Sequence, residues 1–207
     1  MKPKTGGWFW LVGWLFPRSL VTEVIATSVH FHASPETVWQ QMLLYEDVPV
    51  SPPFLLRVFL PQPVRTDGDK TRVGAAVQCT YNGGHLIKRI MVSERPRLVQ
   101  FDVVEQHLGI EGCVTTVGGS YEFLPRDGQT EVVLTTNYRG HLRPRSFWRP
   151  LERILTRQLH HHILNGMRGS LTRTELAARA AIAEHSIPKS ADSEELTCMA
   201  SPSRSLR

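Results

Sequence analysis

The sequence predicts an α+β fold in which a curved antiparallel sheet of about seven strands wraps around a long C-terminal helix. Short runs of alternating apolar and polar residues fill the middle of the chain, closed by turns such as Asn82-Gly83-Gly84 and Arg126-Asp127-Gly128. No helical segment separates these runs, so we expect antiparallel neighbours rather than the parallel strands of βαβ units. An amphipathic stretch after Arg139 completes the pattern.

The first predicted strand spans residues 24–32, where β-branched residues alternate with smaller or polar ones. A helix should follow directly. Ser34 is a suitable N-cap, Pro35 suits the first helical position and Glu36 favours a helix N-terminus. We therefore expect a short helix that ends at about Tyr45.

The remaining strands are expected after an irregular segment, residues 47–53, which contains three prolines. Six runs have the period of a strand: residues 56–64, 72–81, 85–94, 98–105, 115–124 and 130–139. Pro61 and Pro63 cannot donate ladder hydrogen bonds, so they place the first of these strands at an edge of the sheet.

The C-terminal helix is expected over residues 149–168, with an extension to about Glu184. Pro150 is tolerated only in the first turn, which sets the start near Arg149. One face should be buried because its apolar residues recur at steps of three and four: Leu151, Ile154, Leu155, Leu159 and His162. The opposite face is basic and carries Arg149, Arg153 and Arg157.

The composition indicates a globular protein rather than a nucleic-acid binder. Of the 207 residues, 41% are hydrophobic and 21% are charged, and the net charge is +5. This mildly basic balance fits an anionic membrane surface or an acidic ligand, but no Lys/Arg block with interleaved aromatics marks a nucleic-acid site. Cys79, Cys113 and Cys198 are too few and too scattered for a disulfide framework or a structural zinc site. We expect reduced thiols, a cytoplasmic location and no cofactor.

The first 20 residues form an aromatic segment that we treat separately from the domain, which we place at residues 21–184. Trp8, Trp10 and Trp14 lie between cationic flanks in an apolar run that is too short to span a bilayer. Such a run is typical of a segment anchored at the membrane interface, and packing on the domain is the alternative. Residues 185–207 are rich in Ser, Pro and charge, which predicts a disordered tail.

Several segments together resemble the SRPBCC superfamily, which contains START domains, polyketide cyclases and coenzyme Q-binding proteins. The first strand runs into Ala33-Ser34-Pro35-Glu36, followed by Val38-Trp39, an opening common in this superfamily. The resemblance covers roughly residues 21–167 and extends to the hairpin at Tyr81, the run Gly118-Gly119 and the closing helix. It implies a helix-grip fold with a ligand cavity between sheet and helix, but it specifies no activity, because the superfamily mixes carriers, sensors and enzymes.

The preferred function is binding, and transport, of a hydrophobic lipid, quinone or polyketide-like molecule in that cavity. Tyrosine hydroxyls can bond a ligand carbonyl from an apolar wall, and a buried arginine suits an anionic or carbonyl head group. The expected ligand-binding residues are Tyr81, Arg89, Phe101, Tyr121, Tyr138, Arg139, Leu155, Leu159 and His162.

The alternative function is a polyketide cyclase or dehydrase that uses the same cavity. It requires a positioned acid or base, for which His107, Glu105 and His162 are the candidates. We expect no metal site, because His160, His161 and His162 point in directions about 100° apart on a helix and cannot converge on one ion. A third interpretation is an interaction module whose groove takes a peptide or a partner helix.

Overall fold

The structure is a computed structural model that describes residues 21–185. The chain forms two compact units, residues 1–173 and residues 174–207, and all seven strands belong to the first. The expected membrane anchor with Trp8, Trp10 and Trp14 and the expected tail from residue 186 lie outside the described residues, and the domain limits stay a prediction. Within the described part of the chain, no helix has both the length and the apolar character to cross a membrane.

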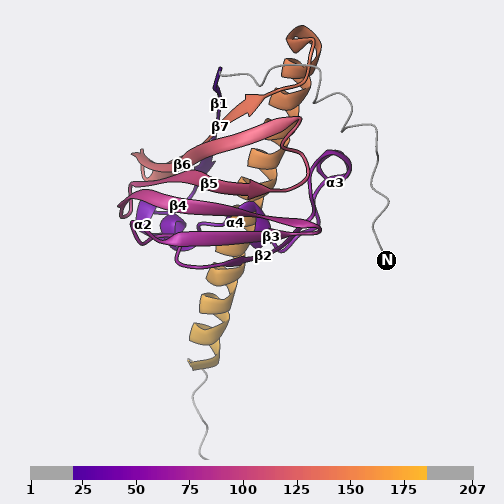
Figure 1. Ribbon diagram of the computed structural model, residues 1–207. Coiled ribbons are helices and arrows are strands. Elements are labelled where there is room, and N and C mark those ends of the chain that lie inside the picture. The colour runs from indigo at the N-terminus through magenta and orange to yellow at the C-terminus, as the bar shows by residue number, and fades with distance from the viewer. Residues whose placement is uncertain (1–20, 186–207) are drawn as a thin grey trace, which may run out of the picture. The chain divides into compact units, whose positions relative to one another are not determined.

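Seven strands form one antiparallel sheet, as the alternation predicts. They are β1 (Glu23–Phe31), β2 (Pro63–Asp67), β3 (Ala76–Tyr81), β4 (Gly84–Glu94), β5 (Leu98–His107), β6 (Val114–Arg126) and β7 (Gln129–Gly140). Their order in the sheet is β1-β7-β6-β5-β4-β3-β2, so the meander from β2 to β7 is closed by β1. Figure 1 shows these strands crossing the long helix α4 (Arg145–His185), which confirms the predicted fold class.

The helix after β1 is shorter than predicted. Helix α2 (Pro35–Gln40) begins as expected, because the Ser34 side chain accepts a hydrogen bond from the backbone N–H of Thr37. It ends at Gln40, and a separate 3₁₀ turn, η1 (Tyr45–Asp47), follows. The interruption matters for the site, because η1 brings a glutamate, Glu46, into the protein interior.

The strand predicted over residues 56–64 is wrong. Residues Phe54–Phe59 form helix α3, in which the backbone N–H of Arg57 donates to the carbonyl of Pro53 at 3.1 Å. Only Leu56 of this helix is fully buried. An apolar run this short does not show whether its residues repeat with the period of a strand or with that of a helix. Strand β2 begins later, at Pro63, and lies at the edge of the sheet as the prolines predict.

The predicted start of α4 at Arg149 is also wrong, because the helix begins at Arg145. The carbonyl of Pro144 accepts hydrogen bonds from the N–H groups of Phe147 and Trp148, so the first turn forms ahead of Pro150. Pro150 then costs the helix one backbone hydrogen bond near its start.

The core lies between the concave face of the sheet and α4. Its fully buried members come from α2, α3, the strands and α4: Phe31, Val38, Leu56, Val77, Val99, Phe123, Val132, Leu164 and Met167. Trp39 packs on Phe123 with ring centroids 5.2 Å apart, at the closed part of this core. The predicted buried face of α4 is confirmed in part, because Leu155 and Leu159 pack on the core whereas Ile154 is exposed.

The basic face of α4 does not simply face solvent. Glu23 on β1 is buried and lies 2.8 Å from Arg149 Nε and 3.6 Å from Arg153 Nη2. These ion pairs tie the N-terminal part of α4 to the edge of the sheet, although Arg149, like Arg157, remains exposed.

Candidate functional site

A cavity of about 190 Å³ lies between the concave sheet, η1 and the first half of α4. Most of its wall is apolar and comes from four strands, α4, the loop before β6 and the residues next to η1 and α3: Leu44, Leu60, Leu86, Phe101, Leu108, Ile110, Val114, Leu134, Leu155, Leu159 and Ile163. Trp39 and Phe123 pack elsewhere in the core, and the aromatic core residues therefore leave this space open. An apolar cleft with a few polar groups is the usual form of a small-molecule site.

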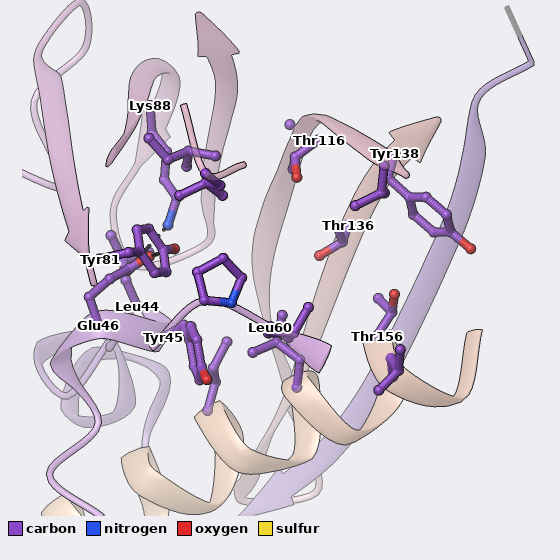
Figure 2. A pocket seen from close by; sticks show the side chains of 18 of the residues that line it. Leu44, Tyr45, Glu46, Leu60, Tyr81, Lys88, Thr116, Thr136, Tyr138 and Thr156 are labelled. Carbon is purple, nitrogen blue, oxygen red and sulfur yellow. Dashed lines mark hydrogen bonds and ion pairs between the residues drawn. The ribbon is translucent and has the colours of Figure 1, made fainter. Parts of the chain in front are cut away.

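Three polar side chains meet on one side of the cavity, and we call them the Lys88 cluster: Glu46, Tyr81 and Lys88. The Glu46 side chain is 0% exposed and the Lys88 side chain 10%, and Lys88 Nζ lies 3.4 Å from Glu46 Oε2. The Tyr81 hydroxyl donates a hydrogen bond to the other Glu46 oxygen, Oε1. Figure 2 shows the Lys88 amine directed toward Tyr81 and Glu46.

The register of β3 and β4 places Lys88 in this cluster. Leu86 and Ile90, two positions before and after Lys88, are buried, so alternation directs Lys88 to the same concave face. Lys88 Nζ also lies 5.4 Å from the centroid of the Phe101 ring on β5, which stabilises a cation there. An ammonium has three donors, and the bond to Glu46 uses one of them.

The ionisation of the cluster follows from burial and from the charge of Glu46. Burial lowers the pKa of Lys88, but the Glu46 carboxylate outweighs this and holds the pKa of Lys88 above its ordinary value. Burial and the same carboxylate raise the pKa of Tyr81 well above its ordinary range and that of Tyr45 to about 12. At neutral pH the cluster therefore offers the Lys88 ammonium as a donor toward an acceptor oxygen, because the Tyr81 hydroxyl is already bonded to Glu46.

The other side of the cavity carries hydroxyl groups from three elements: Thr116 on β6, Thr136 on β7 and Thr156 on α4 (Figure 2). Thr136 Oγ1 lies 2.8 Å from Nε2 of His160, whose Nδ1 lies 2.9 Å from Thr27 Oγ1. His160 is fully buried, and burial lowers its pKa to about 4, so the imidazole is neutral at pH 7. Sequence analysis considered His160 only as a metal ligand and missed this role in holding β1, β7 and α4 together.

Two tyrosine hydroxyls at the cavity are buried without a partner. The Oη atoms of Tyr45 and Tyr138 have no hydrogen-bond partner among the described residues. Burying an unsatisfied hydroxyl costs about 1–3 kcal/mol, but neither Oη atom has surface open to the cavity, so these two groups mark a polar defect in the wall rather than a contact point for a ligand.

Six of the predicted ligand-binding residues lie on the cavity wall: Tyr81, Phe101, Tyr121, Tyr138, Leu155 and Leu159. The Tyr121 hydroxyl already donates to the carbonyl of Leu43 at 2.7 Å, whereas Tyr81 bonds within the Lys88 cluster. The wall thus combines the apolar positions of α4 with phenols from β3, β6 and β7.

The other predicted residues lie elsewhere. Arg89 is exposed, because it neighbours Lys88 on β4 and so points to the opposite face, and Arg139 Nε donates to Thr22 at 3.3 Å. His162 is buried behind the cavity wall, with its ring 5.9 Å from the Tyr45 ring, in a second hollow beside Val48. Glu105 and His107 occupy the outer face of the sheet and do not reach the cavity.

The sequence did contain a signal for Lys88. Leu86, Lys88 and Ile90 alternate within one strand, and this pattern places Lys88 on the same face as two apolar residues, but Sequence analysis did not use it. Glu46 had no comparable signal, because its burial depends on the 3₁₀ turn η1 and on packing against β3.

Comparison with known proteins identifies the family of the chain and solved structures that share its fold. The family described as polyketide cyclase/dehydrase and lipid transport matches residues 22–175. Norcoclaurine synthase from Thalictrum flavum, solved with dopamine and hydroxybenzaldehyde, is 14% identical with a TM-score of 0.51, covering 84% of this chain and 97% of that chain. The Zhui aromatase/cyclase from Streptomyces sp. R1128 is 17% identical with a TM-score of 0.51, covering 74% of this chain and 95% of that chain.

No curated protein matches the chain. At these identities the solved structures establish the shared fold, and the family match extends over more than half of the sequence. Both agree with the resemblance to the SRPBCC superfamily drawn from the opening motif and the closing helix. The chain therefore belongs to the polyketide cyclase/dehydrase and lipid transport family.

Proposed function

We propose that the protein binds a hydrophobic small molecule that carries acceptor oxygens, in the cavity between the sheet and α4. The observation that carries this proposal is the pairing of an apolar wall with the Lys88 ammonium. A carbonyl or phenolic oxygen that reaches Lys88 Nζ would use a donor that the bond to Glu46 leaves available.

The size of the cavity narrows the ligand class. A volume of about 190 Å³ is smaller than the roughly 300–1,000 Å³ of ordinary ligand pockets. It favours a quinone head group or a polyketide-like molecule of one or two rings over a long acyl chain. In norcoclaurine synthase the same fold holds two aromatic molecules, which is consistent with this class.

The proposal is tested with a hydrophobic dye and a cavity-filling variant. Leu159→Trp places a large side chain in the cavity, whereas Ile154→Trp adds the same side chain at an exposed position of the same helix. We expect 8-anilinonaphthalene-1-sulfonate to bind the parent and Ile154→Trp alike, and Leu159→Trp at least about tenfold more weakly. Equal binding by all three proteins contradicts the proposed site.

We propose that the protein uses this cavity to carry its ligand near a membrane. Phe54 and Val58 on α3 are exposed next to Leu60, which lines the cavity, and Phe147 is exposed on the first turn of α4. Apolar side chains beside a cavity can enter the interface of a bilayer. We expect Phe54→Ser/Val58→Ser to lower binding to phosphatidylcholine–phosphatidylserine vesicles in a flotation assay, and unchanged flotation contradicts this part.

A cyclase or dehydrase is the second candidate function, and the Lys88 cluster is the observation that favours it. A protonated amine beside a phenol can polarise a carbonyl, and the bound Glu46 carboxylate keeps the amine charged. The variant Lys88→Met distinguishes a ligand carrier from an enzyme. Loss of turnover of an aromatic polyketide substrate with dye binding kept supports a catalytic role of the Lys88 cluster, and a parent protein that does not turn over such a substrate contradicts the enzyme.

A further inference from the structure

Three ligand-type side chains converge on the outer face of the sheet, away from the cavity. His85 Nε2 lies 2.8 Å from Glu105 Oε1, and His107 Nε2 lies 3.2 Å from the same oxygen. The ligand atoms of all three residues lie within 4.8 Å of one another. Their side chains are 34%, 44% and 67% exposed for His85, Glu105 and His107, so an ion can reach them from solvent.

The register of β4 and β5 builds this cluster. His85 pairs directly with His107 across the two strands, and Glu105 shares a face with His107 because it lies two positions earlier. Gly84 permits the close approach, since a Cβ at this position would overlap the carbonyl oxygen of His107. The imidazole rings lie 5.1 Å apart between centroids, with their nitrogens directed to one carboxylate.

We propose that His85, Glu105 and His107 bind a divalent transition-metal ion such as Zn²⁺. Imidazole nitrogen and carboxylate oxygen are zinc ligands, and two histidines with one glutamate are a sufficient protein set when water takes the fourth position. Tetrahedral Zn²⁺ with bonds of about 2.0–2.1 Å holds its ligand atoms about 3.3 Å apart. The observed separations of 2.8 and 3.2 Å need only small shifts of exposed side chains to meet this value.

The site is independent of the proposed cavity function. Leu86 and Lys88 point to the concave face, whereas His85 on the same strand points outward. A bound ion would link the start of β4 to the end of β5, directly before Leu108, which lines the cavity. Sequence analysis expected no metal site because it weighed the divergent run His160 to His162. It did not consider His85 with His107, which are far apart in the chain and meet only through strand pairing.

The proposal is tested by titrating the untagged full-length protein with Zn²⁺ in a calorimeter. We expect one high-affinity ion per chain, and at least about tenfold weaker binding in each of His85→Ala, Glu105→Gln and His107→Ala. His30→Ala removes an exposed histidine from another strand and should bind like the parent. Because all four positions are partly or fully exposed, circular dichroism should show the same fold for every variant.

A second readout does not depend on affinity. Co²⁺ in place of Zn²⁺ should give the visible absorption of a tetrahedral ion with nitrogen and oxygen ligands, and the three cluster variants should lose it. The proposal is overturned if the parent binds no Zn²⁺, or if the cluster variants bind it as tightly as His30→Ala does. Neither result bears on dye binding in the cavity, so the two proposals fail separately.

Discussion

Lys88 and Glu46 form a charged pair that is almost completely removed from solvent, with a separation of 3.4 Å between Nζ and Oε2. A buried pair of this kind contributes little net stability, but removing one partner leaves an uncompensated charge. The same pair sets the polarity of the cavity, because the carboxylate keeps the ammonium charged. Stability and ligand recognition therefore depend on the same two residues.

Lys88→Met should lower the free energy of unfolding by about 3–5 kcal/mol, because Glu46 would remain buried without its cation. The double variant Lys88→Met/Glu46→Gln should recover most of this loss, since both charges are gone and an amide oxygen at position 46 can still accept from the Tyr81 hydroxyl. Urea denaturation of the parent and both variants measures the effect. A single variant as stable as the parent, or a double variant no better than the single one, contradicts the assignment of a buried pair.

His160 predicts a defined dependence of stability on pH. Its folded-state pKa of about 4 lies below the roughly 6.5 expected in the unfolded chain, so the unfolded state binds the proton first as pH falls. The contribution is fully present above pH 6.5 and is lost between pH 6.5 and 4, amounting to about 3 kcal/mol.

Glutamine does not titrate in this range, so the variant His160→Gln isolates the contribution of His160 to the pH dependence of stability. We expect its stability, measured by thermal unfolding at pH 7, 6, 5 and 4, to fall less steeply than that of the parent. His162, whose pKa burial also lowers, adds a slope of the same sign in both proteins. Parallel curves for the two proteins would show that His160 is not the titrating group.

At the level of single elements, β6 shows how the sheet curls over α4. Its pairing with β7 shifts register between Thr116 and Gly118, and a Cβ at Gly119 would overlap the carbonyl oxygen of Thr135. The irregularity lies where Gly118 lines the cavity. Such bulges bend a strand, and here the bend forms part of the concave wall.

Gly119→Ala should destabilise the fold by about 1–3 kcal/mol, because a methyl group must be forced between two backbones. Gly112→Ala is the matched control, since nothing lies within 4 Å of a Cβ at that position. We expect the control to stay within about 0.5 kcal/mol of the parent in urea denaturation. Equal losses in both variants contradict a steric requirement for Gly119.

Elements with a strict period could be predicted from the sequence, and short apolar runs could not. Strands β4 to β7 alternate over ten residues or more, so their type and order followed from the pattern. Residues Phe54–Phe59 formed a helix instead of a strand. Five apolar residues around Arg57 fit either structure, and Pro53 together with tertiary packing selects the helix. The apolar cavity wall was predictable in the same way, whereas the burial of Glu46 was not.

At the scale of the whole sheet and α4, two requirements conflict. A stable core must be filled with side chains, whereas a ligand cavity must stay open. The closed part is filled by large side chains such as Trp39 and Phe123, and the open part is lined by half-buried Leu155 and Leu159. Unfilled apolar space forfeits packing energy, so an open cavity beside a dense core is consistent with a site that a ligand completes.

The central claim is that a hydrophobic molecule occupies this cavity, and native mass spectrometry with organic extraction tests it most directly. The protein is purified from its natural host and its intact mass is compared before and after extraction. The account predicts a co-purifying molecule of one or two rings at close to one per chain, absent from Leu159→Trp and retained by Ile154→Trp. A parent protein with the bare mass of the chain, unshifted after quinones and aromatic polyketides are added, would contradict it.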